Sequence, residues 1–218
     1  SHVPGTSERS SPQTAKGKFF LDGEQYTLVQ NNGTNCLHGG TWSFDNKTWD
    51  LVHATAKSVT FRYESPDMEE GFPGKLGVTV EFSFSDTSAD SNDAALHIRY
   101  SAETDKATVL NLTNHAYFNL CGHSGGATHP TVLDHLVTIN TDAFVPVDEN
   151  SIPLGGLEDV EDTPFDLRAP TRIGDAVDFA NAQLIYVGGF DHCYALPARE
   201  PKATPSGTPQ GMPLGVAF

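Results

Sequence analysis

Residues 76–84 read Leu-Gly-Val-Thr-Val-Glu-Phe-Ser-Phe, and an apolar side chain occupies every second position of this stretch. Because successive side chains of a β-strand point to opposite faces, this alternation predicts a strand with one buried face and one more polar face. Residues 49–55 and 58–63 carry the same period of two. The three stretches together predict a sheet of neighbouring strands.

Turn-forming residues separate these stretches, and more strands are expected beyond them. Residues 65–74 contain two prolines and two glycines, and residues 86–93 are mostly polar, so both predict loops. Apolar residues never recur at helical spacing over three turns, so little helix is expected. Many strands joined by turns predict an all-β fold, a large antiparallel β-sandwich. Further strands are expected at residues 95–101 and 107–120, from residue 133 to near residue 144, and at residues 184–187, and another begins within 214–218.

The beginning of the chain combines an irregular segment with a hairpin signal. Residues 1–16 are rich in Ser, Thr, Pro and Lys, and they predict a loop or an extended arm. Asp22-Gly23 favours a two-residue turn between the apolar residues 19–21 and the strand-like residues 26–29. A β-hairpin is therefore expected here.

A chain of 218 residues can form one large core, so a single domain spanning residues 1–218 is expected. In its second half, Phe165 is expected to pack inward. Residues 197–213 predict a loop rich in Pro and Gly, since proline lacks the hydrogen-bond donor that a central strand needs.

The charge balance excludes two classes of partner. Thirteen Lys and Arg against 28 Asp and Glu give a net charge of −15, which repels nucleic-acid phosphates and anionic membrane surfaces. No apolar run of membrane-spanning length and no secretory leader occur in the sequence. Cys36, Cys121 and Cys193 form no CxxC pair, and they predict neither a disulfide framework nor a zinc site. A cytoplasmic protein is therefore expected.

The stretch Asn111–Leu120, NLTNHAYFNL, places a histidine inside a strand-like run. His115 on a rigid strand, flanked by Asn114 and Tyr117, can give or take a proton near neutral pH at a fixed position. The alternative is a core histidine that is hydrogen-bonded to a backbone carbonyl. This stretch alone leaves both interpretations open.

Two further residues make a candidate site with His115. His38 precedes Gly39-Gly40, where missing side chains allow the backbone to lie close to a ligand. Asp191 follows Gly188-Gly189-Phe190, and His192 follows Asp191, so on a strand only one of these two side chains faces the site. Aromatic faces such as Tyr117 and Phe190 can stack on a sugar ring. A metal site is disfavoured because no pair of these residues has helical ligand spacing.

Six motifs resemble, in order and spacing, those of the galactose mutarotase (aldose 1-epimerase) family. The resemblance runs from about residue 15 to residue 196. Its motifs are Asn32-Gly33 through Leu37-His38-Gly39-Gly40, Glu70-Gly71-Phe72-Pro73-Gly74, Leu112–Leu120, Pro146-Val147-Asp148 with Ile152-Pro153, Thr163-Pro164-Phe165-Asp166, and Gly189-Phe190-Asp191-His192.

The resemblance implies a galactose mutarotase-like β-sandwich that interconverts the α and β anomers of free aldoses such as galactose and glucose without a cofactor. By resemblance, His115 matches the general acid, His38 matches a second, positioning histidine, and Asp191 matches a carboxylate that holds sugar hydroxyls. Asn114 and Tyr117, which flank His115, are expected to contact the monosaccharide.

The sequence departs from the family pattern near both ends. Where the family has a GR.ANRI-like segment before the first hairpin, residues 8–14 keep only Arg9, as an expected substrate contact, and the family's preceding strands are absent. The family's catalytic base is a glutamate of a C-terminal segment, and no glutamate of residues 1–218 has a matching context. A chain incomplete at both ends, with weak activity on its own and unpaired sheet edges, is therefore expected.

Two other functions remain as alternatives. A carbohydrate-binding β-sandwich would keep the sugar contacts without the base. A hexose 6-phosphate mutarotase would need a cluster of basic side chains, which the net charge of −15 disfavours.

Overall fold

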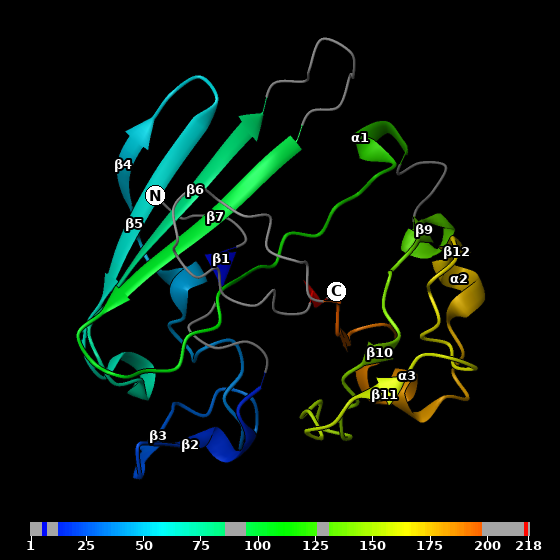
Figure 1. Ribbon diagram of the computed structural model, residues 1–218, viewed down its shortest axis with the longest axis horizontal. Helices are drawn as coiled ribbons and strands as arrows, with labels where there is room; N and C mark the ends of the chain where they lie inside the picture. Colours follow the sequence, from blue (N-terminus) through cyan, green and yellow to red (C-terminus); the bar gives the residue numbers. More distant parts are fainter. Residues whose placement is uncertain (1–5, 8–12, 86–94, 126–130, 198–215, 218) are drawn as a thin grey trace. The chain divides into compact units, whose positions relative to one another are not determined.

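The computed structural model describes residues 6–7, 13–85, 95–125, 131–197 and 216–217 (Figure 1). Contacts within the chain divide it into two compact units, residues 1–117 and residues 118–218. The single domain expected from the sequence stays a prediction, and each unit is described by itself. No helix in the described ranges has the length and apolar character needed to cross a membrane.

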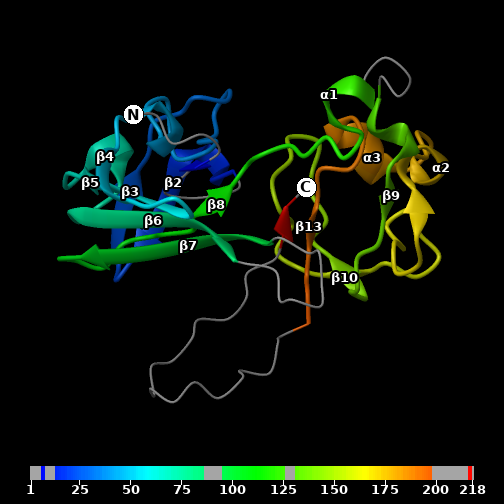
Figure 2. The same ribbon diagram turned by 90° about the horizontal axis from the view of Figure 1, so that it is seen from above.

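A four-stranded antiparallel sheet forms most of the first unit. Its strands are β4 (Asp50–Ala54), β5 (Ser58–Ser65), β6 (Leu76–Ser85) and β7 (Ala95–Thr104), paired in the order β4-β5-β6-β7. Strands β5, β6 and β7 lie side by side in both ribbon views (Figures 1 and 2). Strands β4, β5 and β6 confirm the three strands predicted from the period of two, and β7 confirms the strand expected at residues 95–101. The ladder is continuous from β5 to β7, so Val80 lies opposite Phe61 on one side and Tyr100 on the other.

One face of this sheet covers the core of the first unit. Leu76, Val78 and Val80 are buried at alternate positions of β6, while the residues between them are only half-buried. Phe44 and Trp49 complete the cluster, and the Trp49 ring nitrogen donates a hydrogen bond to the Phe44 carbonyl at 2.9 Å. The alternation in the sequence thus becomes a division between core and surface.

The predicted hairpin is confirmed. Strands β2 (Lys18–Leu21) and β3 (Glu24–Thr27) pair antiparallel around Asp22 and Gly23. Both turn residues have positive φ, 52° and 83°, which a two-residue turn matching the twist of the strands requires.

The remaining elements of the first unit are short. Strand β1 (Thr6–Ser7) pairs with β8 (Thr113–Asn114), so this part of the expected N-terminal arm is extended. The one-turn 3-10 helices are η1 (Ala15–Gly17), η2 (Phe44–Asn46) and η3 (Glu69–Gly71).

The strand expected over residues 107–120 is wrong except at β8. Residues 107–112 and 115–119 form no regular secondary structure. Within the described residues, β8 pairs with β1 alone and over two residues, so no ladder extends the segment. Tyr117, Phe118 and Leu120 are 86%, 69% and 78% exposed instead of covered.

The second unit contains six strands of two residues each in its described ranges. One sheet has the order β11-β10-β13-β14, and β9 pairs with β12. The strands are β9 (Leu136–Val137), β10 (Ala143–Phe144), β11 (Glu158–Asp159), β12 (Thr171–Arg172), β13 (Cys193–Tyr194) and β14 (Val216–Ala217). The helices are α1 (Gly122–Gly125), η4 (Val132–Asp134), α2 (Ile173–Ala176) and α3 (Ala182–Val187).

Two strand predictions in this unit need correction. Residues 184–187 belong to helix α3, because Asn181 caps its start by accepting a hydrogen bond from the Gln183 amide and Gly188 ends it with a φ of 74°. The strand expected from residue 133 to near residue 144 is not continuous, since its beginning forms the helical turn η4 and only β9 and β10 are strands. The strand expected within 214–218 is present as β14, and residues 198–213 of the expected Pro- and Gly-rich loop lie outside the described residues.

Aromatic rings form the core of the second unit. Phe165 is 1% exposed, as its expected inward packing requires, and its ring stacks on Phe144 with centroids 4.1 Å apart. Val160, Leu184 and Tyr194 are buried in the same cluster.

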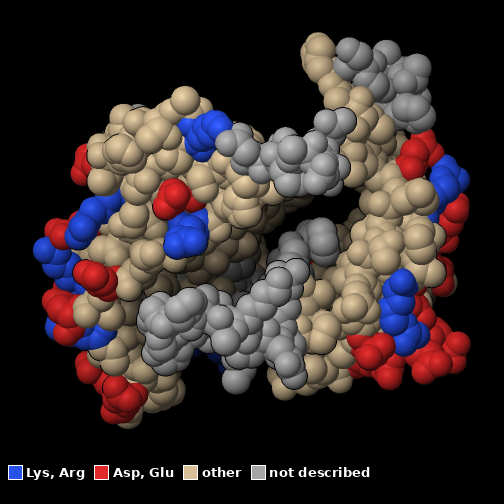
Figure 3. Space-filling model, turned by 45° about the horizontal axis from the view of Figure 1, so that its top comes forward, with Lys and Arg blue, Asp and Glu red and all other residues tan. Residues whose placement is uncertain are grey.

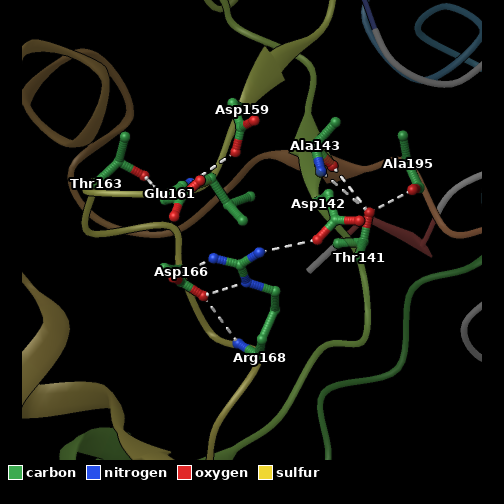
Figure 4. A network of polar contacts seen from close by, with 10 residues as sticks. Thr141, Asp142, Ala143, Asp159, Glu161, Thr163, Asp166, Arg168 and Ala195 are labelled. Atoms are coloured by element: carbon green, nitrogen blue, oxygen red, sulfur yellow. Dashed lines mark hydrogen bonds and ion pairs between the residues drawn. The ribbon is translucent and has the colours of Figure 1, made fainter.

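Polar side chains tie the loops of the second unit together (Figure 4). The Thr141 hydroxyl accepts a hydrogen bond from the Ala143 amide and donates one to the Ala195 carbonyl. Arg168 donates two hydrogen bonds to Asp166 and one to Asp142, and this pairing holds the pKa of Asp166 below its usual value.

The fold belongs to the predicted all-β class. Every strand pair in the described ranges is antiparallel, and the helices are few and short. Acidic and basic side chains are interspersed on the face of each unit that Figure 3 shows.

Candidate active site

His38 lies in a loop with an unusual backbone. His38, Gly39 and Gly40 have φ angles of 55°, 78° and 110°, so three successive residues adopt conformations that L side chains rarely take. His38 is half-buried and both glycines are buried. The glycines allow the chain to turn within a narrow space, and the histidine is the residue of the three that carries a functional side chain.

His115 follows β8 directly and lies next to His38. The two imidazole rings meet edge to face, with centroids 5.4 Å apart and planes at 90°. The Tyr117 ring lies 5.2 Å from the His115 ring on the same segment. The first unit therefore brings together three of the residues that the sequence predicted for the site.

Asn114 shapes the backbone around His115. Its side-chain oxygen accepts a hydrogen bond from the Ala116 amide at 3.0 Å, across His115. This local bond replaces the strand ladder expected there and turns the chain after β8. His115 is thus held by an asparagine-stabilised turn, which corrects the expectation of a histidine on a rigid strand.

Tyr117 combines ring contact with exposure. Although it neighbours the His115 ring, 86% of its surface is accessible in the described residues. A ring exposed beside two imidazoles offers a flat apolar face with a hydroxyl at its end, the kind of surface on which sugar rings stack.

Asp191 and His192 belong to the second unit and have opposite environments. Asp191 is exposed, whereas His192 is 1% exposed and packs against the Phe165 and Phe144 rings. Desolvation lowers the pKa of His192 to about 4, so its ring is neutral at pH 7. The two side chains therefore differ in burial, and that only one of them, Asp191, faces a sugar site stays a prediction.

His192 has one identified polar contact. Its Nε2 lies 3.2 Å from the Gln183 side-chain oxygen, which also accepts a hydrogen bond from the Val147 amide. Within the part of the chain that the structure describes, its Nδ1 is buried without a hydrogen-bond partner. The His192 ring is therefore part of the core of the second unit, where it contacts Gln183 of α3 and the Phe144 and Phe165 rings.

The other described histidines lie outside the His38–His115 pair. His53, His97 and His123 are exposed, and His135 is half-buried and accepts a hydrogen bond from the Leu120 amide. Arg9 and His129 lie outside the described residues. In the described part of the chain, no group of three His, Cys, Asp or Glu residues is placed to hold a metal ion, and the three cysteines are free.

The paired imidazoles support proton transfer and polar recognition. A histidine can act as general acid when protonated and as donor or acceptor when neutral, and a second ring at contact distance restrains its orientation. The sequence analysis assigned no role to Asn31 and Glu70, which contact the backbone of the His38 loop. Their only sequence signal is their place in or beside motifs of the resemblance.

Comparison with known proteins agrees with these features. The profile of the family described as aldose 1-epimerase matches residues 11–212. Galactose mutarotase from Bos taurus is 41% identical over 194 residues, which are 89% of this chain and 52% of the relative. Galactose mutarotase from Homo sapiens is 39% identical over the same shares, and aldose 1-epimerase from Escherichia coli is 37% identical over 88% of this chain and 52% of the relative.

Solved structures give the same assignment of the fold. A GalM/aldose epimerase homologue from C. elegans matches with a TM-score of 0.76 and 29% identity, covering 90% of this chain and 56% of its own. A galactose 1-epimerase from Lactobacillus acidophilus matches with a TM-score of 0.76 and 29% identity, covering 92% and 57%. The predicted β-sandwich fold is confirmed, and the chain spans about half the length of the curated relatives it matches.

Proposed function

The chain belongs to the aldose 1-epimerase family, and we propose that it serves to interconvert the α and β anomers of free aldoses such as galactose and glucose. The observation that carries the proposal is the edge-to-face contact of the His38 and His115 rings, with 5.4 Å between centroids, at two motifs of the family resemblance. Monosaccharides are the proposed ligands, and no cofactor takes part.

The proposed reaction is ring opening followed by closure on the other face. His115 protonates the ring oxygen while a base removes the C1 hydroxyl proton, and the bond between C1 and the ring oxygen breaks to give the open-chain aldehyde. Rotation about the bond between C1 and C2 exposes the other face of the carbonyl. On closure, the hydroxyl formed from the ring oxygen attacks C1 and returns its proton to His115, while the base returns its proton to the C1 oxygen, which gives the opposite anomer.

The other residues act in binding under this proposal. His38 contacts the sugar beside His115, and Asp191 accepts hydrogen bonds from sugar hydroxyls. Tyr117 offers its exposed ring for stacking, Asn114 holds the turn that carries His115, and Arg9 is a further proposed contact.

The group that removes the C1 hydroxyl proton is not identified by any motif of residues 1–218. Glu149, Glu158, Glu161 and Glu200 do not occupy the context of the family's glutamate. We therefore expect weak turnover from this chain alone and faster turnover when the corresponding segment of a relative is joined to it.

Polarimetry tests this proposal. Freshly dissolved α-galactose or α-glucose is followed with the 218-residue chain and with the same chain joined to the C-terminal part of the Bos taurus relative, while calorimetry measures sugar binding. We expect binding by both proteins and acceleration by the joined protein. Full activity of the 218-residue chain would place a base such as Glu200 or Asp191 within it, and absence of sugar binding by both proteins would overturn the function.

A carbohydrate-binding protein without catalysis is the second candidate, because the same sugar contacts can serve binding alone. Binding without acceleration in both proteins would establish it. A hexose 6-phosphate substrate ranks last because of the net charge of −15, which also disfavours nucleic acid and membranes as partners. A cytoplasmic location is part of the proposal and is supported by the three free cysteines.

A further inference from the structure

The loop that carries His38 is clamped on both sides by side chains without a role in the proposed reaction. On the N-terminal side, the Asn31 side-chain nitrogen donates to the Leu37 carbonyl at 2.8 Å, and the Asn31 side-chain oxygen accepts from the Leu37 amide at 2.7 Å. Both backbone groups of the residue before His38 are therefore bound by one amide side chain.

On the C-terminal side, Glu70 closes the clamp. Its Oε2 accepts a hydrogen bond from the Thr41 amide at 2.8 Å. A Cβ added to Gly40 would lie 2.1 Å from the same oxygen, so the carboxylate occupies the space that a side chain at this position would fill. The buried Gly40, with its φ of 110°, is thus shaped around the Glu70 carboxylate.

Glu70 is itself held in place by its backbone. It has a φ of 51°, and its carbonyl accepts a hydrogen bond from the Val29 amide at 3.2 Å. A Cβ added to the next residue, Gly71, would lie 2.2 Å from the Thr27 carbonyl oxygen, so this turn packs tightly on the chain that follows β3. Because these contacts hold the turn at Glu70 in place, the Glu70 carboxylate can hold the His38 loop in position.

The negative charge of Glu70 also affects a buried residue next to the His38 loop, Cys36. Burial raises the pKa of the Cys36 thiol to about 11, and the nearby Glu70 carboxylate adds to the rise. The carboxylate thus lies near the loop from Cys36 to Thr41.

We propose that Asn31 and Glu70 are positioning residues that act through His38. By holding the backbone of Leu37 and Thr41, they keep residues 38–40 at the positive φ angles that set the His38 ring against His115. The contribution to sugar turnover rests on the function proposed above, whereas the ring geometry is independent of it. Loss of the clamp should raise KM because His38 is no longer presented to the sugar, and it should lower kcat because the His38 ring is no longer held in its orientation against His115.

The first test uses the 218-residue chain without sugar. Nuclear magnetic resonance of the histidine rings, assigned with His38→Gln and His115→Gln, should show a cross-ring contact that Glu70→Ala removes and Glu70→Gln keeps, since a glutamine oxygen still accepts from Thr41. Glu69→Gln is the matched control, because Glu69 lies in the same helical turn but pairs with Lys47 and Tyr63. Equal loss of the ring contact in this control would mean general loosening and would overturn the proposal.

A coupled pair of substitutions sharpens the test. Gly40→Ala places a methyl group where the Glu70 carboxylate lies, so it should remove the same ring contact. Since both changes break one interaction, the double variant Gly40→Ala/Glu70→Ala should be no worse than Gly40→Ala alone. Additive effects would show that the two residues act separately and would contradict the clamp.

Turnover and binding give the last test, in the chain joined to the C-terminal part of the Bos taurus relative. Glu70→Ala should lower kcat/KM by about tenfold to a hundredfold, the range for loss of a hydrogen bond to a charged group, and Glu70→Gln should recover most of it. If the joined protein binds no sugar, the proposed function fails while the ring measurement still decides the clamp. An Ala variant with unchanged ring contact and unchanged kcat/KM would overturn the clamp alone.

Discussion

In the first unit, strands of five, eight, ten and ten residues pair in chain order, whereas the strands of the second unit have two residues each in its described part. The first unit obtains its order from a continuous backbone ladder over an alternating apolar face. The second obtains it from an aromatic cluster and from side chains that bond to loop backbone, such as Thr141 and Gln183. The difference teaches that two segments of one chain can reach a packed core with and without long strands.

The chemistry under our proposal depends most on the first unit. His115→Ala in the joined protein should lower the rate of anomerisation by about 10²- to 10⁴-fold, because the general acid is lost. Sugar binding should weaken far less. Polarimetry beside calorimetry measures both quantities, and retention of the full rate would show that His115 is a core histidine and that the first unit does not carry the acid.

The aromatic core of the second unit offers the next largest effect. Phe165→Ala should destabilise this unit by about 3–5 kcal/mol, since the ring is 1% exposed and contacts four other rings. Hydrogen exchange should show loss of protection in β10 and β13 while β5 and β6 keep theirs. Equal loss of protection in both units would mean that they unfold together and would break the comparison.

Acid should weaken the second unit through His192. Its pKa is about 4 when folded, against about 6.5 for an exposed histidine, so below pH 6.5 the unfolded chain binds a proton that the buried ring does not. The stability contributed by the neutral ring is present above pH 6.5 and falls by about 3 kcal/mol as the pH approaches 4. Denaturant unfolding of His192→Leu should lose this acid dependence.

The matched control for this prediction is His53→Leu, at an exposed position of β4. An equal loss of acid dependence in the control, or none in His192→Leu, would contradict the assignment to the second unit.

The smallest effect is expected from a surface ion pair of the first unit. The Lys75 Nζ lies 2.8 Å from the Glu64 Oε1, and each side chain is 52% exposed, so solvent screens their attraction. Glu64→Gln should change the free energy of unfolding by less than about 0.5 kcal/mol. A loss above about 1 kcal/mol by denaturant unfolding would show that the sheet depends on surface charge as well as on its ladder.

The sequence predicted the two units unequally for physical reasons. Strands β4, β5 and β6 follow from local alternation of apolar and polar residues, which is clearest in β6 with its buried alternate positions, and the hairpin follows from Asp22-Gly23. The apolar run at residues 184–187 suggested a strand, since four residues cannot distinguish the two periods. The signals for helix α3 were its ends, Asn181 and Gly188, which lie outside the apolar run.

The candidate site was predictable in its residues and less so in its backbone. His38 and His115 stood out because glycines or strand-like neighbours surround them. The turn made by Asn114 and the clamp made by Asn31 and Glu70 depend on contacts between side chains and backbone, some from residues far apart in sequence. The pattern of apolar residues and the spacing of motifs do not predict such contacts between side chains and backbone.

The pairing of Phe144 with Tyr194 also affects the order in which strands can pair while the chain is being synthesised. Each strand from β4 to β7 meets its partner as soon as the next hairpin leaves the ribosome, so this sheet can form while later residues are still being added. Strand β10 can pair with β11 once residues 158–159 have emerged, but it must wait for about fifty residues before β13 emerges on its other side. The sheet of the second unit can therefore be completed only late in the synthesis of these residues, whereas the sheet of the first unit grows strand by strand.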